Sequence, residues 1–250
     1  MVKTVKELVR EKTVLFWTVA WPIIWVLIGS FSFTGDAPAE VLPAVRGSVT
    51  VPMMVFALMM AGMANLPGNI AQDRERGLLS KLMSMPISPW RDLVGRFLGL
   101  LVFSCLAVVS VALVGYGVGA RFSFTATGAL QAVGFLLLII LASAGIGMLI
   151  GTFIKNVHGA IMTGVGASVI TSAISGVMVP YSALPDLLQA FSRAYPISSA
   201  NSSIIYLLVG ADYAGYTPLT TGQTALTVII SLLLFVAGLI AYSRFCWRKE

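Results

Sequence analysis

A charge-rich segment between two long apolar runs holds the residues whose types and spacing could do chemistry. Between Asp73 and Arg96 the chain carries five basic and three acidic side chains. Apolar residues recur within it at helical spacing, and Pro86 ends the run. These apolar residues are Leu78, Leu79, Leu82 and Met85. An amphipathic helix of mixed charge favours docking on another protein over docking on lipid; an ordinary charged loop is the alternative interpretation.

Catalytic chemistry, in contrast, has no candidate residues. The chain has one histidine, His158, and two cysteines, Cys105 and Cys246, which lie in or beside apolar runs. No Ser/His/Asp set, His-Glu-x-x-His pair, metal-binding cysteine cluster or Gly-x-x-x-x-Gly-Lys-Ser/Thr phosphate loop can be assembled. We therefore expect no enzyme activity, no metal site and no cofactor bound by this chain.

The composition indicates an integral membrane protein. Of the 250 residues, 58% are hydrophobic and 10% are charged, whereas soluble domains have about 45–50% apolar and about 25% charged residues. The formal net charge of +6 lies beside apolar runs, which favours a lipid bilayer over nucleic acid as the partner.

Six apolar stretches are long enough to cross a bilayer, which takes about 20 residues of helix. None contains Asp, Glu, Lys or Arg. The predicted spans are residues 14–33, 49–70, 97–118, 129–154, 159–179 and 224–242. We expect an all-α protein with a single transmembrane domain over residues 1–250. The stretch 184–209 is interrupted by prolines and charges, and it is predicted to form re-entrant or interfacial helices.

Basic residues predict the orientation of these spans. With alternating spans, thirteen of the sixteen Lys and Arg residues lie on the side of the N-terminus, which predicts cytoplasmic N- and C-termini. Residues 1–13 alternate apolar and charged residues at helical spacing and predict an amphipathic helix at the membrane surface. A frayed basic tail is the alternative.

The spans offer few polar groups for a transport pathway. Because no span holds an ionisable residue, coupling to ions through side-chain carboxylates is not expected, and uphill transport would need energy from a partner. Asn65 and Asn69 lie on one face of the second span, where they line a pathway or form a helix–helix hydrogen bond. Met59 and Met63 on the same helix could line a pocket for apolar ligands, or simply pack.

The charged segment resembles the signature of type-2 ABC exporter permeases. The resemblance rests on Asp73-Arg74-Glu75-Arg76-Gly77, Leu82, Pro86-Ile87-Ser88 and Gly95-Arg96. A second similarity, to the segment between the fifth and sixth spans, rests on Pro180, Leu184-Pro185, Tyr195-Pro196 and Gly210. Asp73 stands where the family more often has Glu, and Arg96 where it has Lys.

The resemblance implies a permease in the plasma (inner) membrane of a prokaryote. It implies a homo- or heterodimer of permeases with two copies of an ATP-binding subunit, which would bind the ATP and Mg²⁺. Residues 71–96 would form the coupling loop against that subunit. Its contact residues would be Asp73, Arg74, Glu75, Arg76, Gly77, Leu78, Lys81 and Leu82.

The apolar spans favour a hydrophobic or amphipathic cargo, such as a drug or lipid, moved out of the cytoplasm or the inner leaflet. The alternative is an ATP-independent channel or facilitator without an ATPase partner. That alternative would also lack charges in its spans, but it would not need an amphipathic helix after Gln72. Glycines of the fourth and fifth spans, including Gly145, Gly147 and Gly164, predict close helix packing.

Overall fold

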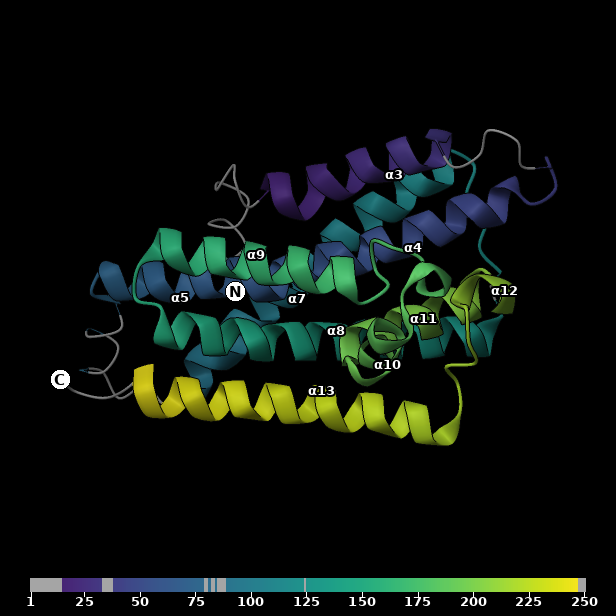
Figure 1. Ribbon diagram of the computed structural model, residues 1–250. Coiled ribbons are helices and arrows are strands. Elements are labelled where there is room, and N and C mark those ends of the chain that lie inside the picture. Colours follow the sequence, from purple (N-terminus) through teal and green to yellow (C-terminus); the bar gives the residue numbers. More distant parts are fainter. Residues whose placement is uncertain are drawn as a thin grey trace.

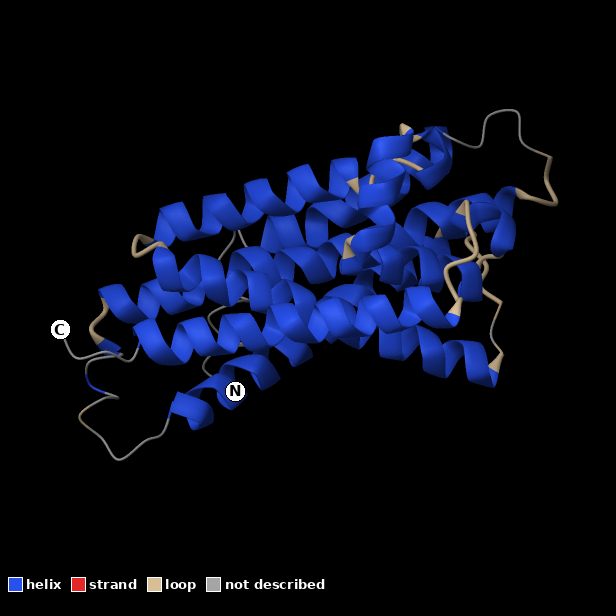
Figure 2. Cartoon of the chain, turned by 60° about the horizontal axis from the view of Figure 1, so that its bottom comes forward, coloured by secondary structure: helices blue, strands red, loops and turns tan. Residues whose placement is uncertain are grey.

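The computed structural model describes residues 15–32, 38–78, 81, 84, 89–123 and 125–246. Every regular element in these residues is a helix (Figure 2), as the all-α prediction requires. The amphipathic helix predicted for residues 1–13 lies outside them. Five helices are long and apolar enough to cross a membrane: Leu42–Glu75, Trp90–Gly117, Ala126–Phe153, Val157–Ile174 and Thr221–Cys246.

The first predicted span is a shorter apolar helix. It consists of a π-helical turn, η1 (Phe16–Ala20), and α3 (Trp21–Ser32), which together have fewer residues than the five long helices. This helix packs against α4 (Leu42–Met60) and α7 (Pro89–Gly117). The count of six spans therefore stays a prediction.

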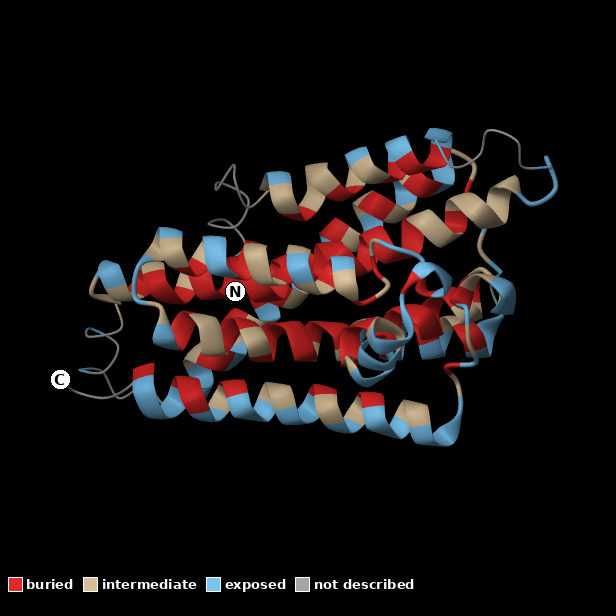
Figure 3. Ribbon diagram, in the orientation of Figure 1, coloured by how far each residue is buried: buried red, intermediate tan, exposed pale blue. Residues whose placement is uncertain are grey.

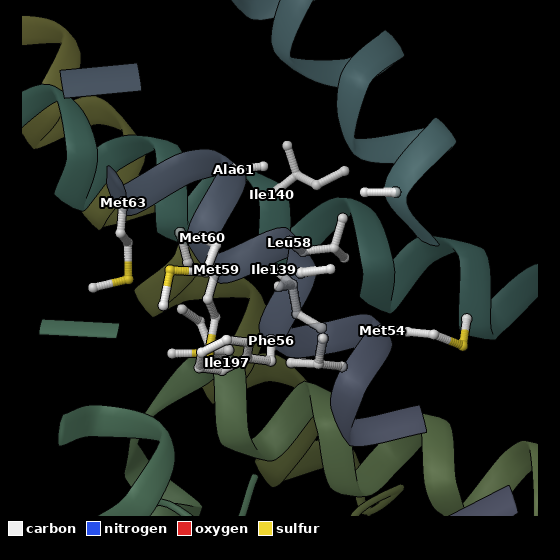
Figure 4. Packing of buried hydrophobic residues seen from close by; sticks show 14 of the residues in the cluster. Met54, Phe56, Leu58, Met59, Met60, Ala61, Met63, Ile139, Ile140 and Ile197 are labelled. Atoms are coloured by element: carbon white, nitrogen blue, oxygen red, sulfur yellow. The ribbon is translucent and has the colours of Figure 1, made fainter. Parts of the chain in front are cut away.

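One long helix runs through the centre of the protein. It is formed by α4, a π-helical segment η2 (Ala61–Asn65) and α5 (Leu66–Glu75). Nearly all of its apolar window is buried. Its bulky side chains, such as Phe56 and Met59, pack with Ile139 and Ile197 from other helices (Figure 4). Burial of these side chains supplies the apolar core that holds the bundle together.

The remaining long helices surround this central one. They are α7, α8 (Ala126–Phe153), α9 (Val157–Ile174) and α13 (Thr221–Ala241), which continues as a π-helical turn, η4 (Tyr242–Cys246). The helix α8 packs against α5 on one side and α13 on another, and α9 packs against α5 and η2 (Figure 1). Each outer helix therefore contacts the central helix directly or through α8.

Glycines set how closely these helices approach. A Cβ atom on Gly147 of α8 would collide with the backbone carbonyl of Gly62, and one on Gly145 would collide with the backbone of Leu234 in α13. A Cβ on Gly164 of α9 would collide with the carbonyl of Met63. Small residues allow membrane helices to pack backbone to backbone, so the predicted close packing is confirmed at these glycines.

The outward faces of the long helices are apolar. Along α13, exposed and buried residues alternate with the helical repeat, and its exposed face points away from the bundle (Figure 3). Leu113 of α7, Leu130 of α8 and Leu233 of α13 are each more than 60% exposed. An apolar exterior of this extent is typical of a protein surrounded by lipid.

Helices extend into both ends of the predicted coupling loop. Residues 71–75 continue α5, and residues 89–96 form the first turns of α7, so the connection is shorter than the predicted loop 71–96. The helices extend because Asp73 and Arg96, which a hydropathy count places outside the spans, pair with each other inside the bundle. Pro89 is the first residue of α7, a position where its missing N–H costs no hydrogen bond.

The helix at the predicted fifth span, 159–179, ends a few residues earlier than the span. The helix α9 ends at Ile174, and Gly176 has φ of +84°, a conformation that favours glycine and turns the chain away. After this turn come η3 (Tyr181–Ala183), α10 (Asp186–Ala194), α11 (Pro196–Leu208) and α12 (Ala211–Ala214). These short elements lie at the opposite end of the bundle from the end of α5 (Figure 1). Two helices, α10 and α11, thus occupy the predicted re-entrant stretch.

Candidate functional site

The charged residues at the end of α5 form a network inside one end of the bundle. Nη2 of Arg96 lies 2.7 Å from Oδ2 of Asp73. Nε of Arg96 donates to Oδ2 of Asp92, one turn earlier on α7, at 2.7 Å. The hydroxyl of Tyr242 donates to the same Asp92 oxygen at 2.7 Å. Because Asp73 and Arg96 are each 5% exposed, these pairs join α5, α7 and η4 in a site shielded from water.

Arg74 connects the same turn of α5 to two other elements. Its Nη2 donates to the backbone carbonyl of Thr152 at 3.3 Å and to Sγ of Cys246 at 2.9 Å. Thr152 lies in the last turn of α8, where the carbonyl groups carry partial negative charge that attracts a cation. Arg74 therefore fastens the end of α5 to the ends of α8 and η4.

Glu75 connects the end of α5 to the start of α9. Its Oε1 accepts a hydrogen bond from the backbone N–H of Val157 at 3.0 Å. Val157 is the first residue of α9, and helix N-termini favour a negative charge. Asn156 accepts from the N–H of Gly159 at 2.9 Å, so a carboxylate and an amide share the capping of α9.

Three consecutive residues thus hold α5 to the four helices around it. Asp73 binds α7, Arg74 binds α8 and the end of α13, and Glu75 binds α9. The sequence predicts all three as contacts with a partner protein. In the structure their side chains bind within this chain.

The residues that follow Glu75 are less buried than Asp73. Arg76 and Lys81 are exposed, and Leu78 is half-buried. Gly77 has φ of +66°, and no atom of the described residues lies within 4 Å of the position that a Cβ would occupy. The left-handed turn that ends α5 favours glycine at this position. Leu82 lies outside the described residues.

The predicted pathway residues lie in the packed interior. Asn65 is 2% exposed, and its Nδ2 donates to the hydroxyl of Thr18 at 2.9 Å. It therefore forms the helix–helix hydrogen bond that the sequence left open as one of two roles. Met59 and Met63 are fully buried in the core, and Asn69 is half-buried. A pathway past the methionines requires the surrounding helices to separate.

Sequence reasoning missed a cavity at the opposite end of the bundle. Its volume is about 370 Å³, and its walls come from α3, the first half of α4, the connection after α9, α11 and α12. Trp25, Ser48, Tyr181, Ser202 and Asp212 are among the lining residues. The cavity could not be predicted from the sequence, because its wall combines segments far apart in the chain.

Tyr181, in the wall of this cavity, contacts Arg193 and Tyr216. Nε of Arg193 donates to the Tyr181 hydroxyl at 2.6 Å. Its guanidinium lies 5.6 Å from the ring centre of Tyr181 and 5.2 Å from that of Tyr216, within range of cation–π attraction. Burial raises the pKa of Tyr216, so its phenol stays neutral at physiological pH.

No cluster of metal-ligating side chains is present among the residues that the structure describes. Among residues 15–246, excluding those not described, no group of three or more His, Cys, Asp or Glu side chains could hold a metal ion. The two cysteines are free; Cys105 is exposed and Cys246 is buried.

Comparison with known proteins identifies the family. A search of curated proteins gave no match. A family model described as ABC-2 type transporter matches residues 1–209. The match includes the charged turn of α5 and ends before α13, whose extension η4 completes the network through Tyr242 and Cys246. Membrane domains of this family are transmembrane components without catalytic activity. The chain therefore belongs to the ABC-2 type transporter family, as a multi-pass permease domain.

Proposed function

We propose that this chain is the membrane subunit of an ATP-driven exporter, powered by a separate ATP-binding subunit. Permeases of this family generally work with such subunits. The partner would dock on the segment that starts at Arg76, using Gly77, Leu78, Lys81 and Leu82. Two copies of that partner would bind ATP and Mg²⁺ and serve a pair of permeases.

The observation that carries this proposal is the set of bonds made by residues 73–75. The proposed docking segment follows Glu75 directly, and Asp73, Arg74 and Glu75 hold α7, α8, α9 and η4. A displacement of the segment by the partner would reach all of these helices at once. The buried pair of Asp73 and Arg96 in particular would transmit such a displacement, because separating two opposite charges shielded from water costs much free energy.

The proposed orientation places this network on the cytoplasmic side. Both chain termini would be cytoplasmic, η1 and α3 would form a first span, and the total would be six. The helices α10 and α11 would then lie at the extracellular end, where they could control the exit. This arrangement follows the excess of Lys and Arg at the network end.

The proposed cargo is hydrophobic or amphipathic, such as a drug or lipid. The interior around Met59 and Met63 is apolar, and flexible methionines adapt to ligands of different shape. The buried charges that the structure describes at the network end are joined to one another, which is the arrangement expected of structural pairs. Energy for export would come from ATP hydrolysis on the partner.

The test is co-purification from native membranes in mild detergent, with identification of the bound subunits. A chain carrying Lys81→Glu and Leu82→Asp should lose a cassette ATPase that the wild-type chain retains. Arg244→Glu is the matched control, since Arg244 is an exposed basic residue at the same end. Recovery of wild-type chain alone, together with cargo flux that does not depend on ATP, would overturn the proposal in favour of a channel or facilitator.

A further inference from the structure

The cavity between α3, α4, α11 and α12 has the charge pattern of a binding site. Among the described residues that line it, Asp212 is the only charged side chain. Arg193, which is not among the lining residues, contacts the lining residue Tyr181 and also lies over the ring of Tyr216. The Asp212 carboxylate, exposed on α12, is therefore the charged group of the lining that attracts a cation.

A second acceptor comes from the backbone of α4. Pro52 lies inside this helix and has no N–H, so the carbonyl of Ser48, one turn earlier, lacks its usual donor. Ser48 and Pro52 both line the cavity. The hydroxyl of Ser48 donates to the carbonyl of Val45 at 2.8 Å, which leaves its oxygen as an acceptor. Both of these groups favour a positively charged or hydrogen-donating ligand.

Aromatic rings provide the third feature. Trp25, Tyr181 and Tyr213 line the cavity. The indole of Trp25 stacks on Trp21, with ring centres 6.2 Å apart and planes inclined by 21°, which holds it in place. Aromatic faces attract organic cations, and tryptophan does so most strongly. Val49, Met53 and Ile205 supply apolar walls for an uncharged body.

We propose that this cavity binds an organic monocation with a compact apolar body, its positive centre between Asp212 and the aromatic rings. The volume of about 370 Å³ falls in the range of small-molecule sites. Binding itself depends only on this chain; the further step, that such cations are cargo held before release, rests on the proposed export function.

The test measures binding to the purified chain in lipid nanodiscs, without any ATPase. Benzyltrimethylammonium is the probe, and benzylsulfonate is an anion of similar shape. By isothermal titration calorimetry we expect saturable binding of the cation and none of the anion. Asp212→Asn should weaken cation binding by about tenfold, as should Trp25→Leu. Asp186→Asn and Trp90→Leu, which lie outside the cavity, are the matched controls and should bind as wild type does.

The proposal is overturned if the cation does not bind saturably, if the anion binds equally well, or if Asp212→Asn binds the cation with wild-type affinity. Asp212 is exposed on a short helix, so its substitution leaves the bundle intact. Co-purification reports on the export function separately. If an ATPase co-purifies but the cation does not bind, only the proposed cation site is refuted. If the cation binds but no ATPase co-purifies, only the proposed ATP-driven export is refuted.

Discussion

Asp73 near the end of α5 and Arg96 in α7 form an ion pair of 2.7 Å, with both side chains buried. The pair lies where the two helices leave the bundle and the proposed docking segment begins. Asp92 and Tyr242 extend it to η4. One buried network therefore joins the turn that precedes the proposed docking segment to α7 and η4.

The first prediction concerns the stability contributed by this pair. Asp73→Asn should lower the free energy of unfolding by about 3–5 kcal/mol, because it leaves a buried guanidinium with one carboxylate in place of two. The midpoint of thermal unfolding in detergent, followed by tryptophan fluorescence, measures the effect. Asp186→Asn, an exposed acidic residue of α10, is the control. Equal midpoints for both variants would contradict a structural role for the pair.

The second prediction separates docking from packing at Glu75. Glu75→Gln keeps an oxygen that can accept from the Val157 N–H, so this variant should stay close to wild type in stability. Glu75→Ala loses the cap and should cost about 1 kcal/mol. The double variant Glu75→Ala with Leu82→Ala should insert normally but uncouple ATP hydrolysis from transport.

Transport and ATPase rates measured in the same vesicles test this expectation. Leu82→Ala alone keeps the cap of α9, so it separates the effect of the docking leucine from the effect of losing the cap. If the double variant transports as wild type does, the assigned contact surface is wrong. If Glu75→Gln alone uncouples the two rates, the charge of Glu75 matters beyond its capping role.

The third prediction concerns the close contact of α8 with η2. Gly147→Ala should destabilise the bundle by about 1–3 kcal/mol, since the new methyl group meets the carbonyl of Gly62. Gly134→Ala on the same helix has no atom within 4 Å of the new group and should be neutral or slightly stabilising. Unfolding midpoints of the two variants in detergent give the comparison. Equal midpoints for the two variants would contradict the packing explanation, because only the methyl group at residue 147 meets another helix.

The sequence by itself determined the membrane class and the approximate position of five helices. Long apolar runs can be recognised without the tertiary structure, because the transfer free energy of each residue into lipid is summed residue by residue along the run. The loose match around Asp73–Gly77 also indicated the right family. The role of Asn65 was left as two alternatives, and its partner Thr18 lies on a different helix.

Only the tertiary structure decided how the charged residues are used. A hydropathy count scores each charged residue by itself, so it placed Asp73 and Arg96 in a loop. In the structure the two side chains pair, and both helices continue into the predicted loop. The cavity beside Asp212 could not be predicted from the sequence either, since α3, α4, α11 and α12 each supply part of its wall. Pairing energies and cavity shapes depend on residues far apart in the chain, and they exist only once the helices are packed.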